Sequence, residues 1–150
     1  MRKYVSVLVL GLMLGGCATA HYDVLQTRQI ESKEFDADVR TTFEAIKVVL
    51  QDNNYMIHSS DFQGGLVTGI GASHLVYDFF KGGDINVSNV VNINFNEVGK
   101  DRTSVRMNLT KRSSNGHIGT IDEAIVDPDM MHKIYADIQK EILVKQNLNK

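Results

Sequence analysis

Two stretches of the chain repeat apolar residues at the spacing of an amphipathic α-helix. The first carries them at intervals of four, three and four residues, at Val39, Phe43, Ile46 and Leu50. Such a stripe covers one face of a helix and leaves the other face polar. A carboxylate at Asp36 or Asp38 can cap the free first-turn amides, and Asp52-Asn53-Asn54 follows the last apolar position. The pattern predicts a helix that ends near residue 52.

The second helical pattern lies near the C-terminus. Its apolar residues recur at intervals of three, four and four, at Met131, Ile134, Ile138 and Ile142, and Tyr135 and Leu143 widen the stripe. Asp127-Pro128 precedes them, and a capping aspartate followed by proline is typical of a helix start. We expect this helix to run from Pro128 to about Gln146.

Other segments alternate apolar and polar residues, as half-buried strands do. The clearest are 91–96 and 104–110, which the turn at 97–101 joins into an antiparallel hairpin. One face of this hairpin is apolar, and the other carries asparagines, Arg106 and Thr110. Shorter strands are expected at 29–35, 55–59 and 66–70. The last two flank a turn at 61–65, and in the first of these two Tyr55, Ile57 and Ser59 share one side.

The order of these elements predicts the fold class. We expect an α+β domain over residues 30–148, a two-layer sandwich in which two helices pack on one face of an antiparallel sheet. The expected order is β-α-β-β-β-β-α, with about four to five strands. Residues 111–125 are polar and contain glycine, which predicts a long loop with room for a short edge strand near Ile118.

Two glycines in the strand at 66–70 and just after it admit two interpretations. Gly69 and Gly71 suggest a phosphate-binding loop, but no Gly-Lys-Ser/Thr follows and no helix opens directly after them. A bulge or a close backbone approach in a hairpin is the better interpretation.

Residues 72–86 are the least regular part of the chain. Five large apolar residues gather there, at Leu75, Val76, Tyr77, Phe79 and Phe80. The favoured interpretation is a short helix or loop folded over one end of the sheet. The alternative is an exposed patch that binds a partner, which makes these five residues the candidate partner-binding site. Asp84-Ile85-Asn86-Val87-Ser88 also resembles the acidic sequon of some bacterial N-glycosylation systems.

The N-terminus has the composition of a secretory signal. Arg2 and Lys3 precede an apolar stretch that ends at Leu14, which is too short for the roughly 20 residues of a spanning helix. Such a segment is removed from the mature protein. We therefore expect residues 1–16 to be a cleaved signal peptide.

Leu14-Gly15-Gly16-Cys17 resembles the lipobox of bacterial lipoproteins. The resemblance implies cleavage before Cys17, a diacylglyceryl thioether on its sulfur and acylation of the new amino group, so that several acyl chains hold the protein on a membrane. Cys17 is the sole cysteine. Ala18 is similar to the residue that follows the cysteine in outer-membrane lipoproteins, and residues 17–29 form the expected tether. The expected location is the cell outer membrane, with the domain in the periplasm.

Charge narrows the class of partners. Removing Arg2 and Lys3 leaves 14 basic residues out of 16 against 18 acidic ones, a net charge of −4 for the mature chain. A nucleic-acid-binding protein needs a basic surface, so we expect no nucleic-acid partner. Membrane lipid, through the acylated Cys17, and an envelope protein are the expected partners.

Several segments carry a family resemblance. Phe35-Asp36-Ala37-Asp38-Val39, residues 43–52, Gly65-Leu66-Val67-Thr68 and residues 127–135 resemble a recurrent pattern in small uncharacterised Gram-negative outer-membrane lipoproteins. More distantly, the layout is similar to the helix-grip domains of BamC, an accessory lipoprotein of outer-membrane protein assembly. The resemblance implies a BamC-like domain in the envelope.

No catalytic pattern stands out in the sequence. The five histidines are scattered without a pair at metal-ligand spacing, and no Gly-x-Ser-x-Gly elbow is present. We therefore expect no enzymatic activity, no metal and no cofactor beyond the covalent lipid. The leading hypothesis is a non-catalytic protein-binding or envelope-assembly module. The alternative is a binder of small molecules or glycans that uses a cavity between helices and sheet, near Met107 and Ile138.

Overall fold

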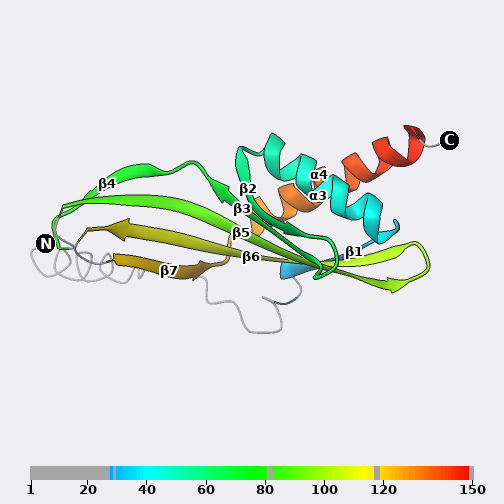
Figure 1. Ribbon diagram of the computed structural model, residues 1–150, viewed down its shortest axis with the longest axis horizontal. Coiled ribbons are helices and arrows are strands. Elements are labelled where there is room, and N and C mark those ends of the chain that lie inside the picture. Colours follow the sequence, from blue (N-terminus) through cyan, green and yellow to red (C-terminus); the bar gives the residue numbers. More distant parts are fainter. Residues whose placement is uncertain (1–27, 29, 81–82, 117–118, 149–150) are drawn as a thin grey trace, which may run out of the picture.

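The computed structural model describes residues 28, 30–80, 83–116 and 119–148. The expected signal peptide, Cys17 and the tether to residue 29 lie outside the described residues, apart from Arg28. Helices and strands follow one another (Figure 1) in the order β1 (Ser32–Phe35), α3 (Val39–Asp52), β2 (Tyr55–Asp61), β3 (Leu66–Gly71), β4 (His74–Asp78), β5 (Gly83–Gly99), β6 (Arg102–Asn115), β7 (Gly119–Ile125) and α4 (Pro128–Leu148).

All the strands belong to one antiparallel sheet. The strand order is β1-β6-β5-β3-β2, with β4 paired to β5 and β7 paired to β6. Both helices lie over the same face of this sheet (Figure 1). The predicted α+β class, with an antiparallel sheet and two helices, is confirmed. The expected four to five strands is wrong, because the sheet has seven, and the order contains two strands that the prediction lacks.

Helix α3 begins at the second of the two carboxylates proposed to cap it. Oδ1 of Asp38 accepts hydrogen bonds from the backbone N–H groups of Arg40 and Thr41, each at 2.9 Å. The helix ends at Asp52 with Asn53 as its C-cap, and Asn54 turns the chain with a φ of 62°. The predicted apolar stripe faces inward, since its last three members are buried: Phe43, Ile46 and Leu50.

Helix α4 also begins as predicted. Oδ1 of Asp127 accepts the backbone N–H of Met130 at 3.0 Å, and Pro128, which has no N–H to satisfy, occupies the first position. The helix ends at Leu148, two residues beyond the expected end. Its buried residues are those of the predicted stripe, Tyr135 included, except Leu143, which is 51% exposed.

The core lies between the two helices and the middle of the sheet. Alternate residues of β5 and β6 face the helices and are buried, namely Val91, Ile93, Phe95, Val105, Met107 and Leu109. Each such side chain contributes about 1.5–3 kcal/mol by leaving water. The predicted alternation in this hairpin is correct, because its apolar positions are the buried ones.

The β5–β6 hairpin is much longer than predicted. The two strands keep one unbroken register from Asn86–Ser114 to Glu97–Thr103. The half near the hairpin turn lies beneath the helices. The other half extends beyond them, flanked by β4 and β7 (Figure 1). We call β4, β7 and segments 83–89 and 111–115 the sheet arm.

Three predictions about the strands need correction. Residues 72–86 do not fold over the sheet as a helix or loop, because β4 pairs with β5 in the arm. Residues 111–125 are not a long loop, because β6 continues to Asn115 and β7 returns beside it. No described helix covers the arm (Figure 1), and in its β6 and β7 segments polar residues occupy both faces, so the alternation that marks a half-buried strand is lost there. The first strand is shorter than 29–35 and begins at Ser32, since residues 30 and 31 are helical.

A tyrosine from α4 fills a break in the edge of the sheet. Beside β6, the β1 ladder stops at Arg106 and the β7 ladder starts at Leu109. In the interval, the buried backbone N–H of Met107 donates to the hydroxyl of Tyr135 at 3.1 Å. That hydroxyl donates in turn to the backbone carbonyl of Glu31. One side chain thus links α4 to β6 and to the residue just before β1.

The β2–β3 pair shows why a small residue stands at position 69. A Cβ added to Gly69 would lie 3.1 Å from Cβ of Tyr55 on the neighbouring strand, so side chains crowd this position. The predicted close backbone approach is found at Gly71, where an added Cβ would lie 3.3 Å from the carbonyl oxygen of Asn89. The irregularity lies in β2 instead, between Ile57 and Ser59. Because a bulge shifts the strand by one residue, Ser59 lies on the face opposite Tyr55 and not on the same side as predicted.

Candidate functional site

The five candidate partner-binding residues form one exposed apolar surface on the sheet arm. Leu75, Val76 and Tyr77 belong to β4, and Phe79 and Phe80 belong to the turn after it. Their exposed fractions run from 42% for Val76 to 98% for Phe80. We call these five residues the β4 surface. Its exposure contradicts the favoured expectation that the segment would be covered.

Strand β4 is an edge strand. It pairs with β5 on one side, and no described strand pairs with its other side. Edge strands present unpaired backbone N–H and C=O groups that can accept another strand. Natural edges are usually protected by charges or proline, whereas Leu75, Val76 and Tyr77 carry neither.

The opposite edge of the arm is protected. On β7, Asp122 receives two hydrogen bonds from the guanidinium of Arg112, at 2.8 and 2.9 Å. The Arg112 hydrogen bonds hold the pKa of the Asp122 carboxyl below its ordinary value. Glu123 follows and lies opposite Lys111 of β6. The arm therefore has one charged edge and one apolar edge.

A pocket lies where the arm joins the helix-covered half of the sheet. Its volume is about 620 Å³. It is lined by the end of α3, the segment from β3 into β4, one residue of β5 and the start of α4: Asn53, Asn54, Tyr55, Gly71, Ala72, His74, Asn89, Asp127, Asp129, Met130, Lys133 and Ile134. Sequence reasoning missed this pocket because its wall comes from four separate segments.

Tyr55 is the buried polar group of the pocket wall. Its side chain is almost fully buried, and its hydroxyl donates to the sulfur of Met130 at 3.4 Å. Burial, and then the nearby negative charge of Asp127, raise the pKa of the Tyr55 hydroxyl. Gly71 leaves room beside it, because an added Cβ would lie 3.4 Å from Cε1 of the Tyr55 ring.

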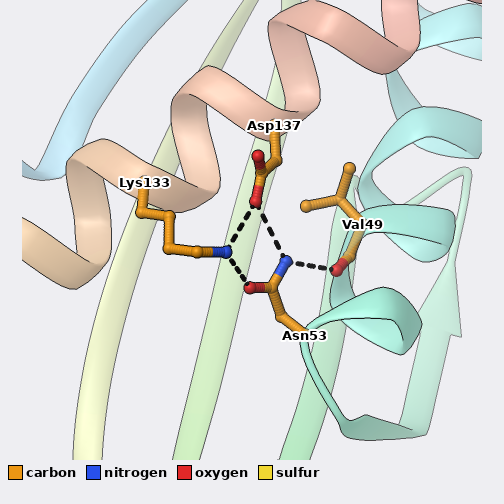
Figure 2. A network of polar contacts seen from close by, with 4 residues as sticks. All are labelled: Val49, Asn53, Lys133 and Asp137. Carbon is orange, nitrogen blue, oxygen red and sulfur yellow. Dashed lines mark hydrogen bonds and ion pairs between the residues drawn. The ribbon is translucent and has the colours of Figure 1, made fainter.

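A polar network holds the two helices together along one side of the pocket (Figure 2). Nζ of Lys133 donates to Oδ1 of Asn53 and, at 2.9 Å, to Oδ2 of Asp137. Nδ2 of Asn53 donates to the carbonyl of Val49 at 2.9 Å and to Asp137 at 3.2 Å. The hydrogen bonds from Lys133 and then Asn53 lower the pKa of the Asp137 carboxyl. Lys133 is thus engaged between the helices, although it also lines the pocket.

The titratable groups of the pocket wall are largely occupied. The Tyr55 hydroxyl is bonded to Met130, the Lys133 ammonium to Asp137, and the Asp127 carboxylate to the start of α4. His74 and Asp129 are exposed. No nucleophilic cysteine or serine is among the described lining residues.

The structure places the remaining sequence candidates apart from this pocket. Met107 and Ile138, expected to border a cavity, are fully buried in the core. Asn86 is exposed but lies on β5 between β4 and β6. Within the described residues, no group of three or more His, Cys, Asp or Glu side chains is arranged to hold a metal ion. Within the same residues, neither helix is long and apolar enough to cross a bilayer.

Comparisons with known proteins leave the family of this chain open. No family model matches the chain, and no curated protein matches it. Among solved structures, it is similar to a DUF4468 family protein from Bacteroides ovatus ATCC 8483, with 11% sequence identity and a TM-score of 0.43. That match covers 85% of this chain and 91% of the other. The resemblance to BamC-like lipoproteins stays a prediction.

Proposed function

We propose that this protein is an outer-membrane lipoprotein whose periplasmic domain is a non-catalytic protein-binding module. The observation that carries the proposal is the β4 surface, an unprotected edge strand with exposed apolar side chains. An extended segment of another chain binds such an edge by adding a strand. The backbone supplies hydrogen bonds, and alternate side chains supply specificity.

The anchor belongs to the same proposal. The lipobox at Leu14-Gly15-Gly16-Cys17 supports lipidation of Cys17, and Ala18 supports delivery to the outer membrane. Replacing Cys17 with serine should abolish metabolic labelling with palmitate and release the chain from the membrane fraction. Retention of label or of membrane attachment in Cys17→Ser would contradict this part of the proposal.

The binding test is photo-crosslinking in intact cells with a probe at Tyr77. Asn94 of β5 is the matched control, because like Tyr77 it is exposed on the polar face, the face of the sheet opposite the helices, but it lies in the helix-covered half and not in the arm. We expect a discrete crosslinked product from position 77 and none from position 94. Equal labelling of the two positions, or no protein product at 77, would contradict binding through β4.

A second test removes the apolar side chains. Serine in place of Leu75, Tyr77, Phe79 and Phe80 should abolish the crosslink from a probe at Val76, while the circular dichroism spectrum and the unfolding midpoint stay the same. Ile121→Ser is the control, since Ile121 is an exposed apolar residue on the other edge strand. If the quadruple variant unfolds, the patch belongs to the core and the proposed surface is wrong.

The pocket favours a second candidate function, the binding of a small molecule or glycan. Its volume of about 620 Å³ lies within the usual range of roughly 300–1,000 Å³ for ligand pockets. A thermal-shift screen against small molecules tests this function. Ala72→Phe would fill the pocket, and Thr120→Phe would add the same ring to an exposed position on β7. A true ligand should stabilise the Thr120→Phe variant and not the Ala72→Phe variant.

A further inference from the structure

We infer that β4 pairs with the β4 strand of a second copy of this chain. The two strands run antiparallel about a twofold axis through Val76. This inference rests on the proposed function, because it names the partner that adds a strand to the same edge. A twofold pairing uses the same surface on both copies and closes after one contact.

The sequence of β4 is self-complementary in this register. With Val76 on the axis, Leu75 lies opposite Tyr77 of the second copy, and His74 lies opposite Asp78 of the second copy. An imidazole and a carboxylate can share a hydrogen bond or, when the imidazole is protonated, an ion pair. The pairing places no like charges opposite each other.

The two faces of the sheet agree with the same register. Leu75 and Tyr77 pair with Asn86 and Asp84 of β5, which place them on the polar face. Val76 pairs with Ile85 and lies on the helix face. Side chains that face each other across a strand pair lie on one side of the sheet and contact each other. The dimer therefore gains two Leu–Tyr contacts on the polar face and one Val–Val contact on the helix face.

The charged edge cannot form the equivalent dimer. A twofold pairing of β7 about its central residue would place Asp122 opposite Asp122 of the second copy, and like charges directly opposite each other are destabilising. Pairing β4 with β7 of the next copy would leave free edges and propagate into a filament. Pairing β4 with β4 consumes the apolar edge of each arm and leaves the charged edge of each arm outside.

The twofold symmetry also determines on which side of the joined sheet the helices of the two copies lie. An axis that relates neighbouring antiparallel strands runs perpendicular to the sheet, so both copies present their helices on the same side. The two polar faces, with Asn92, Asn94 and Asn96, then form one continuous surface on the other side. A five-residue strand pair is a small contact, and confinement of both copies to one membrane would raise their effective concentration.

The test is disulfide trapping in membranes that contain the full-length chain. Val76→Cys places a thiol on the axis, facing its own counterpart. Ile121→Cys is the matched control, because Ile121 is an exposed apolar residue on the helix face of the other edge strand. The unsubstituted chain controls for Cys17. After mild oxidation we expect Val76→Cys to migrate at twice the chain mass on non-reducing gels, while Ile121→Cys and the unsubstituted chain do not.

A mixing experiment tests which residues of the two β4 strands lie opposite each other. Differently tagged Leu75→Cys and Tyr77→Cys chains, expressed together, should form the mixed disulfide in preference to either self-pair. If self-pairs equal the mixed product, the register about Val76 is wrong. Val76→Lys should abolish the dimer, because it places two ammonium groups face to face. Val76 is 42% exposed, so this variant should keep its circular dichroism spectrum.

The outcomes separate this inference from the proposed function. If the probe at Tyr77 captures a different protein and Val76→Cys gives no dimer, the protein-binding function stands and self-pairing is overturned. If Tyr77 captures no protein at all, both fail. Capture of a second copy from Tyr77, lost in Val76→Lys, supports both.

Discussion

Removing the hydroxyl of Tyr135 should destabilise the domain far more than removing the hydroxyl of a surface tyrosine. In Tyr135→Phe, the ring keeps its contact with Phe35, whose centroid lies 6.2 Å away. What is lost is the acceptor for the Met107 N–H and the donor to the Glu31 carbonyl. The variant therefore isolates the contribution of one bridging hydroxyl.

The magnitude follows from burial. Met107 is fully buried. No described strand pairs with β6 at this point on that edge, so the described residues offer its amide no substitute strand partner. Leaving a buried donor unsatisfied costs about 1–3 kcal/mol. Glu31 is only partly buried, so water can replace the bond to its carbonyl and little is added. We expect a loss of about 1–3 kcal/mol in the free energy of unfolding.

Urea denaturation followed by circular dichroism measures this loss. The control is Tyr77→Phe, because Tyr77 is 70% exposed and water solvates its hydroxyl. Surface substitutions usually change stability by less than about 0.5 kcal/mol, so the two variants should separate clearly. A Tyr135→Phe variant as stable as Tyr77→Phe would refute the idea that this hydroxyl completes the edge of the sheet.

Three further predictions address other parts of the domain. Asp38→Ala should lose about 1 kcal/mol in urea unfolding, whereas Asp36→Ala, which removes a neighbouring carboxylate that does not cap α3, should not. Burial raises the pKa of the Tyr135 hydroxyl above its ordinary value, so the unfolded chain releases this proton at a lower pH than the folded chain does. The contribution to stability is therefore intact below pH ~10 and falls as the pH rises further. Tyr135→Phe should flatten that fall in alkaline urea titrations. Gly69→Ala places its Cβ 3.1 Å from the neighbouring strand and should lower the unfolding midpoint, while Gly116→Ala, whose Cβ meets nothing within 4 Å, should leave it unchanged.

The helix-covered half of the fold could be predicted because burial there is one-sided. Both helices carry stripes at helical spacing, and 91–96 and 104–110 alternate, since one side of each element faces the core and the other faces water. The capping residues Asp38 and Asp127 act through their immediate neighbours in the sequence, so local chemistry was enough to identify them.

The sheet arm could not be predicted by the same reasoning. Strand β7 carries polar residues on both faces, so it has no period to detect. The apolar run at 75–80 indicates burial by composition, yet these side chains are exposed. Leu75 and Tyr77 lie on the face opposite the helices, and no described helix reaches this end of the sheet to cover Val76. The bulge in β2 depends on pairing with β3, which local sequence does not encode.

The candidate sites, too, could be predicted from the sequence only in part. The residues of the β4 surface were identified from sequence, while their position on an open edge required the sheet topology. The pocket was missed because Tyr55, His74, Asn89 and Asp127 come from segments that meet only in the folded chain. The role of Tyr135 was also invisible, because it depends on where β1 ends and β7 begins.

The unbroken register of the β5–β6 hairpin constrains how the length of the arm can change during evolution. Adding one residue to each strand would exchange the two faces of everything beyond the insertion, because successive side chains alternate. Leu75 and Tyr77 would then move from the polar face to the helix face. Insertions of two residues, matched in β5 and β6, would lengthen the arm and preserve both faces. Homologous chains should therefore differ in arm length by even numbers of residues per strand, with gains in one strand mirrored in the other.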